Sequence, residues 1–136
     1  MSSELLAACQ TSICMCIRSF RKDGTPVDTP TWTTLIDGKL YCYTDERTFK
    51  VKRFRNNPNV WIAASDVWAR RSTPFYPAVC RFVLEPERGT AIFERIKAKY
   101  GMHWHMSLWG SRLVGRVPHR LVLEFEIAPE AAPLGV

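Results

Sequence analysis

Two Asp-Gly pairs, at residues 23–24 and 37–38, constrain the fold of this chain more than any other feature. A β-prone run from Ile13 to Phe20 precedes the first pair, a run from Val27 to Ile36 lies between the pairs, and Leu40 to Thr44 follows the second. Such a pair between two β-prone runs is a strong signal for a tight hairpin, because its residues tolerate the positive φ angles of the turn. The sequence therefore predicts an antiparallel meander of three strands.

The rest of the chain is predicted to add three more strands and three helices. Apolar residues at helical spacing predict helices at residues 5–12, 46–56 and 87–100. Short apolar or alternating runs predict strands at residues 60–64, 78–84 and 121–127. Several short antiparallel strands with few helices are typical of a small barrel, so we expect a mostly β protein, an antiparallel β-barrel with flanking helices.

The length of 136 residues suits a single domain, residues 1–136, with an N-terminal helix within 1–12 and a loose tail at 129–136. The short length and the lack of a GxGxxG motif together exclude a doubly wound dinucleotide-binding fold. The sequence contains no run of about 18 apolar residues, and its N-terminus lacks the basic region followed by an apolar region that is typical of a signal peptide. We therefore expect a cytoplasmic protein without a membrane segment.

The five cysteines are odd in number and lack the spacing of a disulfide framework, which argues against a secreted disulfide scaffold. Cys14 and Cys16, which lie in an apolar run, are predicted to be buried, reduced thiols. A metal site combining Cys14 and Cys16 with His103 and His105 is disfavoured. The single residue between the two cysteines is not the gap that zinc knuckles use. No metal is therefore predicted.

Basic residues cluster between positions 47 and 55, where five cations occur with no acid among them. The whole chain has a net charge of +6, which predicts attraction to anions. On a helix, Lys50 and Arg53 share a face, while Thr44 should end the preceding strand and Thr48 should lie near the helix start. Hydroxyls, free backbone N–H groups and two cations would together form a phosphate site. A solvated basic helix face and a nucleic-acid patch are the alternatives, the latter because the chain also has five Trp.

Three segments in this order resemble the pyridoxamine 5'-phosphate oxidase-like superfamily, and most of all its deazaflavin-dependent oxidoreductase branch. The first is residues 20–32, FRKDGTPVDTPTW, the second is residues 38–44, GKLYCYT, and the third is residues 50–60, KVKRFRNNPNV. A weaker likeness is Lys99-Tyr100-Gly101. The resemblance covers roughly residues 13–66 well and the rest loosely.

The resemblance implies a split β-barrel of the FMN-binding type that forms a homodimer with its cofactor at the subunit interface. The cofactor would be FMN or the deazaflavin coenzyme F-420, with the deazaflavin favoured by the branch. By position, the phosphate would be held by Thr44, Thr48, Lys50 and Arg53, and the ring system would lie against Thr29, Pro30, Thr31 and Trp32. A proline on an edge strand leaves neighbouring backbone groups outside the ladder, where they can meet a ligand. The alternative is a plain barrel strand with Trp32 in the core.

The expected activity is hydride transfer between the bound cofactor and a small organic substrate. Flavins and deazaflavins carry this chemistry in their own rings, and the sequence has no GxSxG or HExxH motif, so no side chain is assigned as catalytic. His103 and His105 are candidates for a proton donor or for an interface. Residues 64–71, ASDVWARR, lack the glycine of the family's Cys-Asp-basic-basic-Gly stretch, which leaves the substrate and the role of the 66–77 loop open. The alternative function is a non-enzymatic flavin, deazaflavin or haem binder on the same fold; nucleic acid and membrane are not expected partners.

Overall fold

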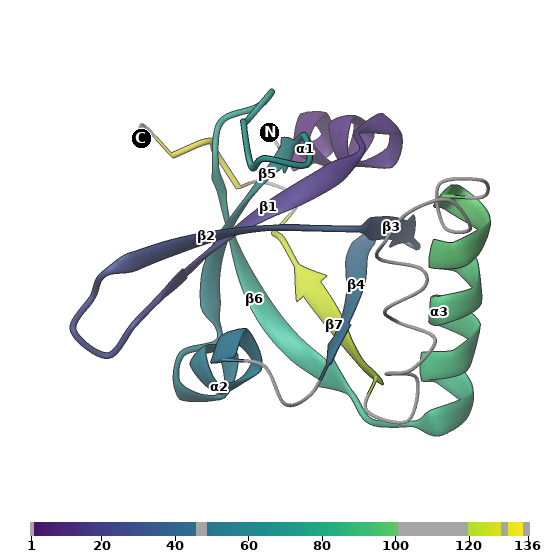
Figure 1. The fold of residues 1–136 in the computed structure, drawn as a ribbon. Coiled ribbons are helices and arrows are strands. Elements are labelled where there is room, and N and C mark those ends of the chain that lie inside the picture. The colour runs from purple at the N-terminus through teal and green to yellow at the C-terminus, as the bar shows by residue number, and fades with distance from the viewer. Residues whose placement is uncertain (1, 46–48, 101–119, 129–130, 135–136) are drawn as a thin grey trace.

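The computed structural model describes residues 2–45, 49–100, 120–128 and 131–134. Seven antiparallel strands and three helices lie in these residues (Figure 1). The strands are β1 (Cys14–Phe20), β2 (Pro26–Thr31), β3 (Thr33–Ile36), β4 (Lys39–Asp45), β5 (Asn59–Ser65), β6 (Tyr76–Val83) and β7 (Arg120–Glu126). The helices are α1 (Ser2–Thr11), α2 (Phe49–Asn56) and α3 (Pro86–Tyr100). The predicted mostly β, antiparallel fold class is therefore confirmed.

The predicted second strand, Val27 to Ile36, is wrong as a single strand, because the structure divides it at Trp32. Its first half, β2, pairs with β1, whereas its second half, β3, pairs with β4. The strand order is β2-β1-β5-β6-β7-β4-β3, so the two halves form the opposite edges of one sheet. Only one residue separates these edges, so the sheet must curl round until they meet, as the twist of β-strands allows. No ladder joins β2 to β3 in the described residues, and the barrel is therefore split rather than closed.

Both predicted Asp-Gly hairpins are confirmed. Asp37 and Gly38 have φ angles of 51° and 80°, and the residues flanking them, Ile36 and Lys39, face each other in the ladder. Two central residues with positive φ define a type I′ turn, whose twist matches that of the strands. Gly24 has a φ of 89° in the longer β1–β2 turn.

The interior of the barrel is a single apolar core to which α1 and α2 contribute. Leu5 and Cys9 of α1, and Val51 and Phe54 of α2, are buried together with the inward-facing residues of the strands. The five cysteines are buried and form no disulfide, which confirms the prediction made for Cys14 and Cys16. Burial raises the pKa of the Cys9 thiol to about 12, so this sulfur stays protonated and unreactive at neutral pH. No helix among the described residues is long and apolar enough to cross a lipid bilayer.

The outer face of the sheet carries a second cluster beneath α3, which lies along β3, β4 and β7 (Figure 1). Tyr43 meets Phe93 edge to face, with ring centroids 4.9 Å apart. Trp32, at the junction of the two sheet edges, is buried in this same cluster. A third, smaller cluster contains Phe75, whose carbonyl accepts a 2.7 Å hydrogen bond from the Leu134 amide. The described part of the predicted loose tail is thus held to the barrel at Leu134.

A buried carboxylate, Glu124 of β7, links the sheet to the start of α3. Its side chain accepts hydrogen bonds from the Tyr41 hydroxyl, at 3.0 Å, and from the Arg88 guanidinium, and Lys39 Nζ lies 3.6 Å from its other oxygen. Burial by itself would raise the pKa of Glu124, but the hydrogen bonds from Arg88 and Tyr41 outweigh it and hold the pKa below its ordinary value of 4.5. The cluster therefore stabilises the charged form of Glu124 in the folded state.

The free energy of unfolding should consequently depend on Glu124 in acid. A lowered folded-state pKa contributes stability that is complete above the unfolded-state pKa and is lost as the pH falls through the folded-state value. Glu124→Gln should cost about 1–3 kcal/mol at pH 7, and the difference from wild type should shrink below pH 4.5. Urea denaturation of both proteins between pH 3 and about 7 measures this. A difference that stayed constant over this range would mean that the carboxylate charge is not what the cluster stabilises.

Candidate functional site

The helix α2 presents an apolar face to the core and a basic face to its surroundings. Val51 and Phe54 lie three residues apart and are both buried, the Phe54 ring meeting Phe125 at a centroid distance of 6.3 Å. The cations of this helix must therefore project elsewhere. Arg55 lies over the Phe82 ring, 5.5 Å from its centroid, whereas Lys52 and Arg53 take other directions.

The β1–β2 hairpin forms a projecting wall opposite α2. The ladder between β1 and β5 ends at the pair Arg18–Trp61, whereas the ladder between β1 and β2 continues to the pair Phe20–Pro26. Beyond Arg18, β1 has a paired neighbour on one side only. The end of the hairpin is thus a two-stranded ribbon that extends past the sheet, to the left of α2 in the view of Figure 1.

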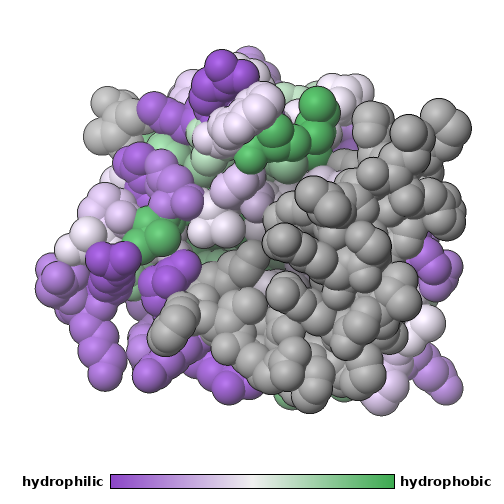
Figure 2. Space-filling model, viewed as in Figure 1, coloured by the Kyte–Doolittle hydropathy of each residue, from purple (hydrophilic) through white to green (hydrophobic). Residues whose placement is uncertain are grey.

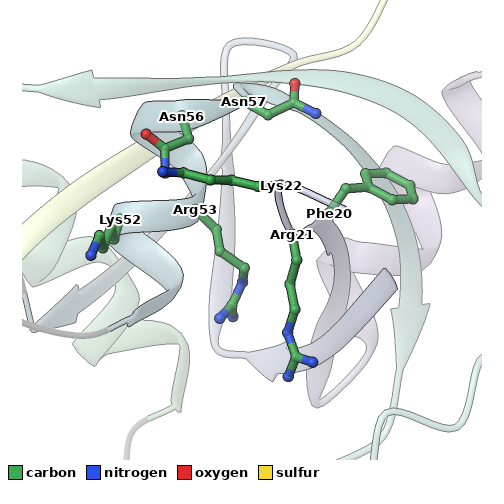
Figure 3. Close-up of a pocket in the computed structure, with 7 residues that line it drawn as sticks. All are labelled: Phe20, Arg21, Lys22, Lys52, Arg53, Asn56 and Asn57. Atoms are coloured by element: carbon green, nitrogen blue, oxygen red, sulfur yellow. The ribbon is translucent and has the colours of Figure 1, made fainter. Parts of the chain in front are cut away.

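A cavity of about 600 Å³ lies between the hairpin and α2 (Figure 3). We call it the basic groove, and it is lined by Phe20, Arg21, Lys22, Lys52, Arg53, Asn56 and Asn57. Four of these lining residues are cationic and none is acidic. Figure 2 shows hydrophilic side chains gathered over this part of the molecule, at the lower left of the view. Like charges repel, so four cations around one cavity favour the entry of an anion.

Arg53 is the most firmly held of the four cations. Its Nε donates a 3.0 Å hydrogen bond to Oγ of Ser19, a buried residue of β1. Burial lowers the pKa of Arg53 from its ordinary value, and the positive charge of Arg21 lowers it further. In Figure 3 the Arg21 and Arg53 side chains extend in the same direction. A guanidinium fixed at one nitrogen next to a second cation is a suitable receptor for an anion.

The hairpin contributes Lys22, whose side chain extends toward Asn56 at the end of α2 (Figure 3). The helix ends there because Pro58 follows, and the Asn57 amide closes the last turn on the Arg53 carbonyl at 2.8 Å. The end of α2 thus contributes the side-chain amides of Asn56 and Asn57 to the groove lining, in addition to cations. Arg21 and Lys22 directly precede the first Asp-Gly pair, and nothing in the neighbouring sequence indicates that they face α2.

The four residues predicted to hold the phosphate are only partly described. Arg53 lines the basic groove, and Lys50 precedes it by one turn of α2, although its side chain lies outside the described residues. Thr44 is buried in β4 opposite Leu121, and Thr48 lies outside the described residues, as do His103 and His105. The assignment of these four residues to a phosphate site therefore stays a prediction. Among them, Arg53 lies where it could contact a phosphate, because it lines the basic groove.

Of the four residues predicted to lie against the ring system, Thr29, Pro30 and Thr31 belong to β2, and Trp32 lies between β2 and β3. The Thr31 hydroxyl is buried and donates to the Met15 carbonyl at 3.3 Å, and Trp32 is 8% exposed beneath α3. Thr29 and Pro30 are half-buried on β2, an edge strand of the sheet. A ligand beside this strand would therefore meet Thr29, Pro30 and edge backbone groups rather than the Trp32 ring.

The 66–77 loop begins with a self-contained turn. Asp66 Oδ1 accepts hydrogen bonds from the amides of Trp68, at 2.8 Å, and Arg70, at 3.0 Å. Ala69 has a φ of 62°, a conformation that glycine would adopt with less strain. The turn exposes the Trp68 ring, and none of its residues lines the basic groove.

No protein-family model and no curated protein matches the sequence. Solved structures match it closely in shape. A presumed pyridoxamine 5'-phosphate oxidase from Listeria innocua has a TM-score of 0.65 at 17% identity, with 99% of this chain and 98% of that chain covered. An F420 reductase has a TM-score of 0.59 at 16% identity, covering 90% and 91%. The heme storage protein HutZ from Vibrio cholerae has a TM-score of 0.65 at 10% identity, covering 96% and 92%. The chain therefore has the split-barrel fold of the pyridoxamine 5'-phosphate oxidase-like proteins, as its sequence predicts.

Proposed function

We propose that this split-barrel protein is an oxidoreductase that binds FMN or the deazaflavin coenzyme F-420 and exchanges a hydride between that cofactor and a small organic substrate. The basic groove carries the proposal. It brings cations from two separate elements to one cavity, with no acid among its described lining residues. Arrangements that hold like charges together are more common at functional sites than elsewhere.

The groove fits the phosphate end of such a cofactor. Its volume of about 600 Å³ lies within the range of small-ligand pockets, about 300–1,000 Å³. Arg53 is oriented by Ser19, so it would lose little conformational freedom when it binds a phosphate. Lys50, one turn earlier on the helix, would add a second charge. The ring system would then extend toward Thr29 and Pro30 on the edge strand β2.

The cofactor, when bound, supplies hydride transfer in its own ring. The chain has to bind the phosphate, orient the ring and keep water away from it. The described lining residues are cations, amides and one phenylalanine, so we assign them to binding rather than to proton transfer. We favour the deazaflavin over FMN because the sequence resembles the deazaflavin-dependent branch most.

The proposal includes a homodimer in which the partner subunit covers the cofactor, and a cytoplasmic location. Five free cysteines suit a reducing compartment. Light scattering coupled to size-exclusion chromatography should give twice the chain mass of 15.6 kDa. A monomer at all concentrations would remove the dimer from the proposal and leave the groove unaffected.

Titration of the purified protein with FMN and with F-420 tests the cofactor assignment. Absorbance and fluorescence should change and saturate near one cofactor per chain. Mass spectrometry of ligand that co-purifies from the native host identifies which cofactor is taken up. Turnover is then measured as oxidation of the reduced cofactor in the presence of enone, tetrapyrrole or amine-phosphate substrates. Absence of saturable binding of either cofactor would refute the proposal.

A binding protein without turnover is the second candidate, supported by the structural similarity to a heme storage protein. It predicts that hemin binds with a sharp absorbance band and that no substrate is converted with any reductant. Hemin binding that is unaffected by excess FMN or F-420 would show that the two ligands do not share a site.

A further inference from the structure

One wall of the basic groove is formed by the β1–β2 hairpin with Arg21 and Lys22, and a single phosphate bound near Arg53 on α2 would not require these two cations. We propose that the groove is a clamp for a ligand with two or more linked anionic groups, held by α2 on one side and by the end of the β1–β2 hairpin on the other. The inference rests on the proposed function, because it assigns a further anionic group of the ligand to the same groove. It is tested with inorganic polyphosphate, so that the two proposals can fail separately.

Charge supports a polyanion. A phosphate monoester carries roughly −1.5 to −2 charges at neutral pH, whereas four cations line the groove. One phosphate beside Arg53 would therefore leave about half of this charge uncompensated. Arg21 and Lys22 belong to the hairpin and Lys52 and Arg53 to α2, so a ligand bridging both elements can reach cations on each side.

The acids near the groove are hydrogen-bonded to groups other than its four cations, although the pKa of Asp23 is lowered by its hydrogen bonds with Thr25 and also by the charge of Arg21. Asp23, in the hairpin turn, accepts a 2.9 Å hydrogen bond from the Thr25 amide and so stabilises its own turn. Asp28 is engaged by the Arg18 guanidinium through two hydrogen bonds, of 2.6 and 2.9 Å. The salt bridges seen among the described residues include none to the four groove cations.

The hairpin wall is held less firmly than the helix wall. Beyond Arg18 the hairpin is a two-stranded ribbon, and such ribbons are only marginally stable by themselves. Within the part of the chain that the structure describes, its contacts include the Arg53–Ser19 hydrogen bond and the edge-to-face contact of Phe20 with Trp61, whose centroids are 5.2 Å apart. An anion bound by both walls would add a further contact between them. Binding should therefore draw the hairpin onto α2 and slow its opening.

Isothermal titration calorimetry at constant ionic strength compares tripolyphosphate with orthophosphate as probes. Tripolyphosphate should bind at least roughly tenfold more tightly, because it adds charge-assisted contacts on the second wall. The double variant Arg21→Ala, Lys22→Ala should lose roughly tenfold or more of the tripolyphosphate affinity and change orthophosphate binding much less. Amide hydrogen exchange at residues 19–27 should slow when wild type binds tripolyphosphate.

The matched control is Arg55→Ala, Arg81→Ala. It removes the same net charge from residues that do not line the groove, one of which is on α2 itself. An equal loss of affinity in the two double variants, equal affinity of wild type for the two probes, or unchanged exchange of the hairpin would each overturn the clamp. All four replaced residues are exposed, so both variants should fold, and thermal melts check this. Hairpin-dependent polyphosphate binding without FMN or F-420 binding would leave the clamp standing and refute the cofactor proposal; the reverse pattern would do the opposite.

Discussion

Replacing Lys50 and Arg53 together by alanine is expected to weaken binding of FMN or F-420 by about 2–4 kcal/mol, the sum of two charge-assisted contacts. This corresponds to a loss of roughly 30-fold to 1,000-fold in the dissociation constant. The physical reason is that a phosphate taken partly out of water needs charged donors that are already in place. Arg53 is such a donor, because Ser19 holds its Nε at 3.0 Å.

The double variant is measured by fluorescence or absorbance titration beside Arg55→Ala. Arg55 is on the same helix but lies over Phe82, so its removal should leave the dissociation constant within about twofold of wild type at moderate salt. Arg53→Ala also removes the hydrogen bond to Ser19, which should cost about 1 kcal/mol of unfolding free energy. A dissociation constant that the double change leaves unaltered would place the phosphate elsewhere, even if the protein still bound the cofactor.

Phe54→Ala should lower the free energy of unfolding by about 3–5 kcal/mol, a large part of the stability of a domain of this size. Phe54 is 2% exposed and packs against Phe125, so the truncation leaves a cavity in the barrel core. The same residue anchors α2, one wall of the basic groove. We therefore expect cofactor and tripolyphosphate affinity to fall together with stability.

Urea denaturation at constant pH measures the loss for Phe54→Ala. Phe54→Leu, which keeps more of the buried volume, should lose less than the alanine variant, and Arg55→Ala should lose about 0.5 kcal/mol through its cation–π contact. If Phe54→Ala lost no more unfolding free energy than Arg55→Ala, the burial of the Phe54 ring in the core would be contradicted. Retention of full anion affinity by a destabilised Phe54→Ala protein would show that α2 is positioned by other contacts.

The limits of sequence reasoning are clearest at Glu124 and Glu126. Both acids alternate with apolar residues in the last strand, a pattern that places both on the polar face of a half-buried strand. The structure covers Glu124 with Arg88 and Tyr41 but leaves Glu126 exposed. Alternation predicts which face a side chain occupies, but it does not indicate that α3 begins over only one of the two positions.

The phosphate site likewise has one part that local sequence patterns predict and another part that they do not. Helical spacing puts Val51 and Phe54 on one face of the predicted helix at 46–56, and the structure buries both of them, while Arg53 lines a cavity. The other half of that cavity, Arg21 and Lys22, was not predicted to take part. These residues are about 30 positions earlier in the chain, and no local pattern records which distant segment a hairpin will face.

The sequence alone determined the elements whose causes are local: the two Asp-Gly turns, set by the φ angles that their residues tolerate, and the helix faces, set by the 3.6-residue period. Only the tertiary structure decided where the strand broke and what it joined. The break at Trp32 places β2 and β3 at opposite edges of one sheet, and the curl of that sheet brings the first hairpin over α2. Strand order arises from burying one shared core, a property of the whole chain, and the basic groove exists only because of that order.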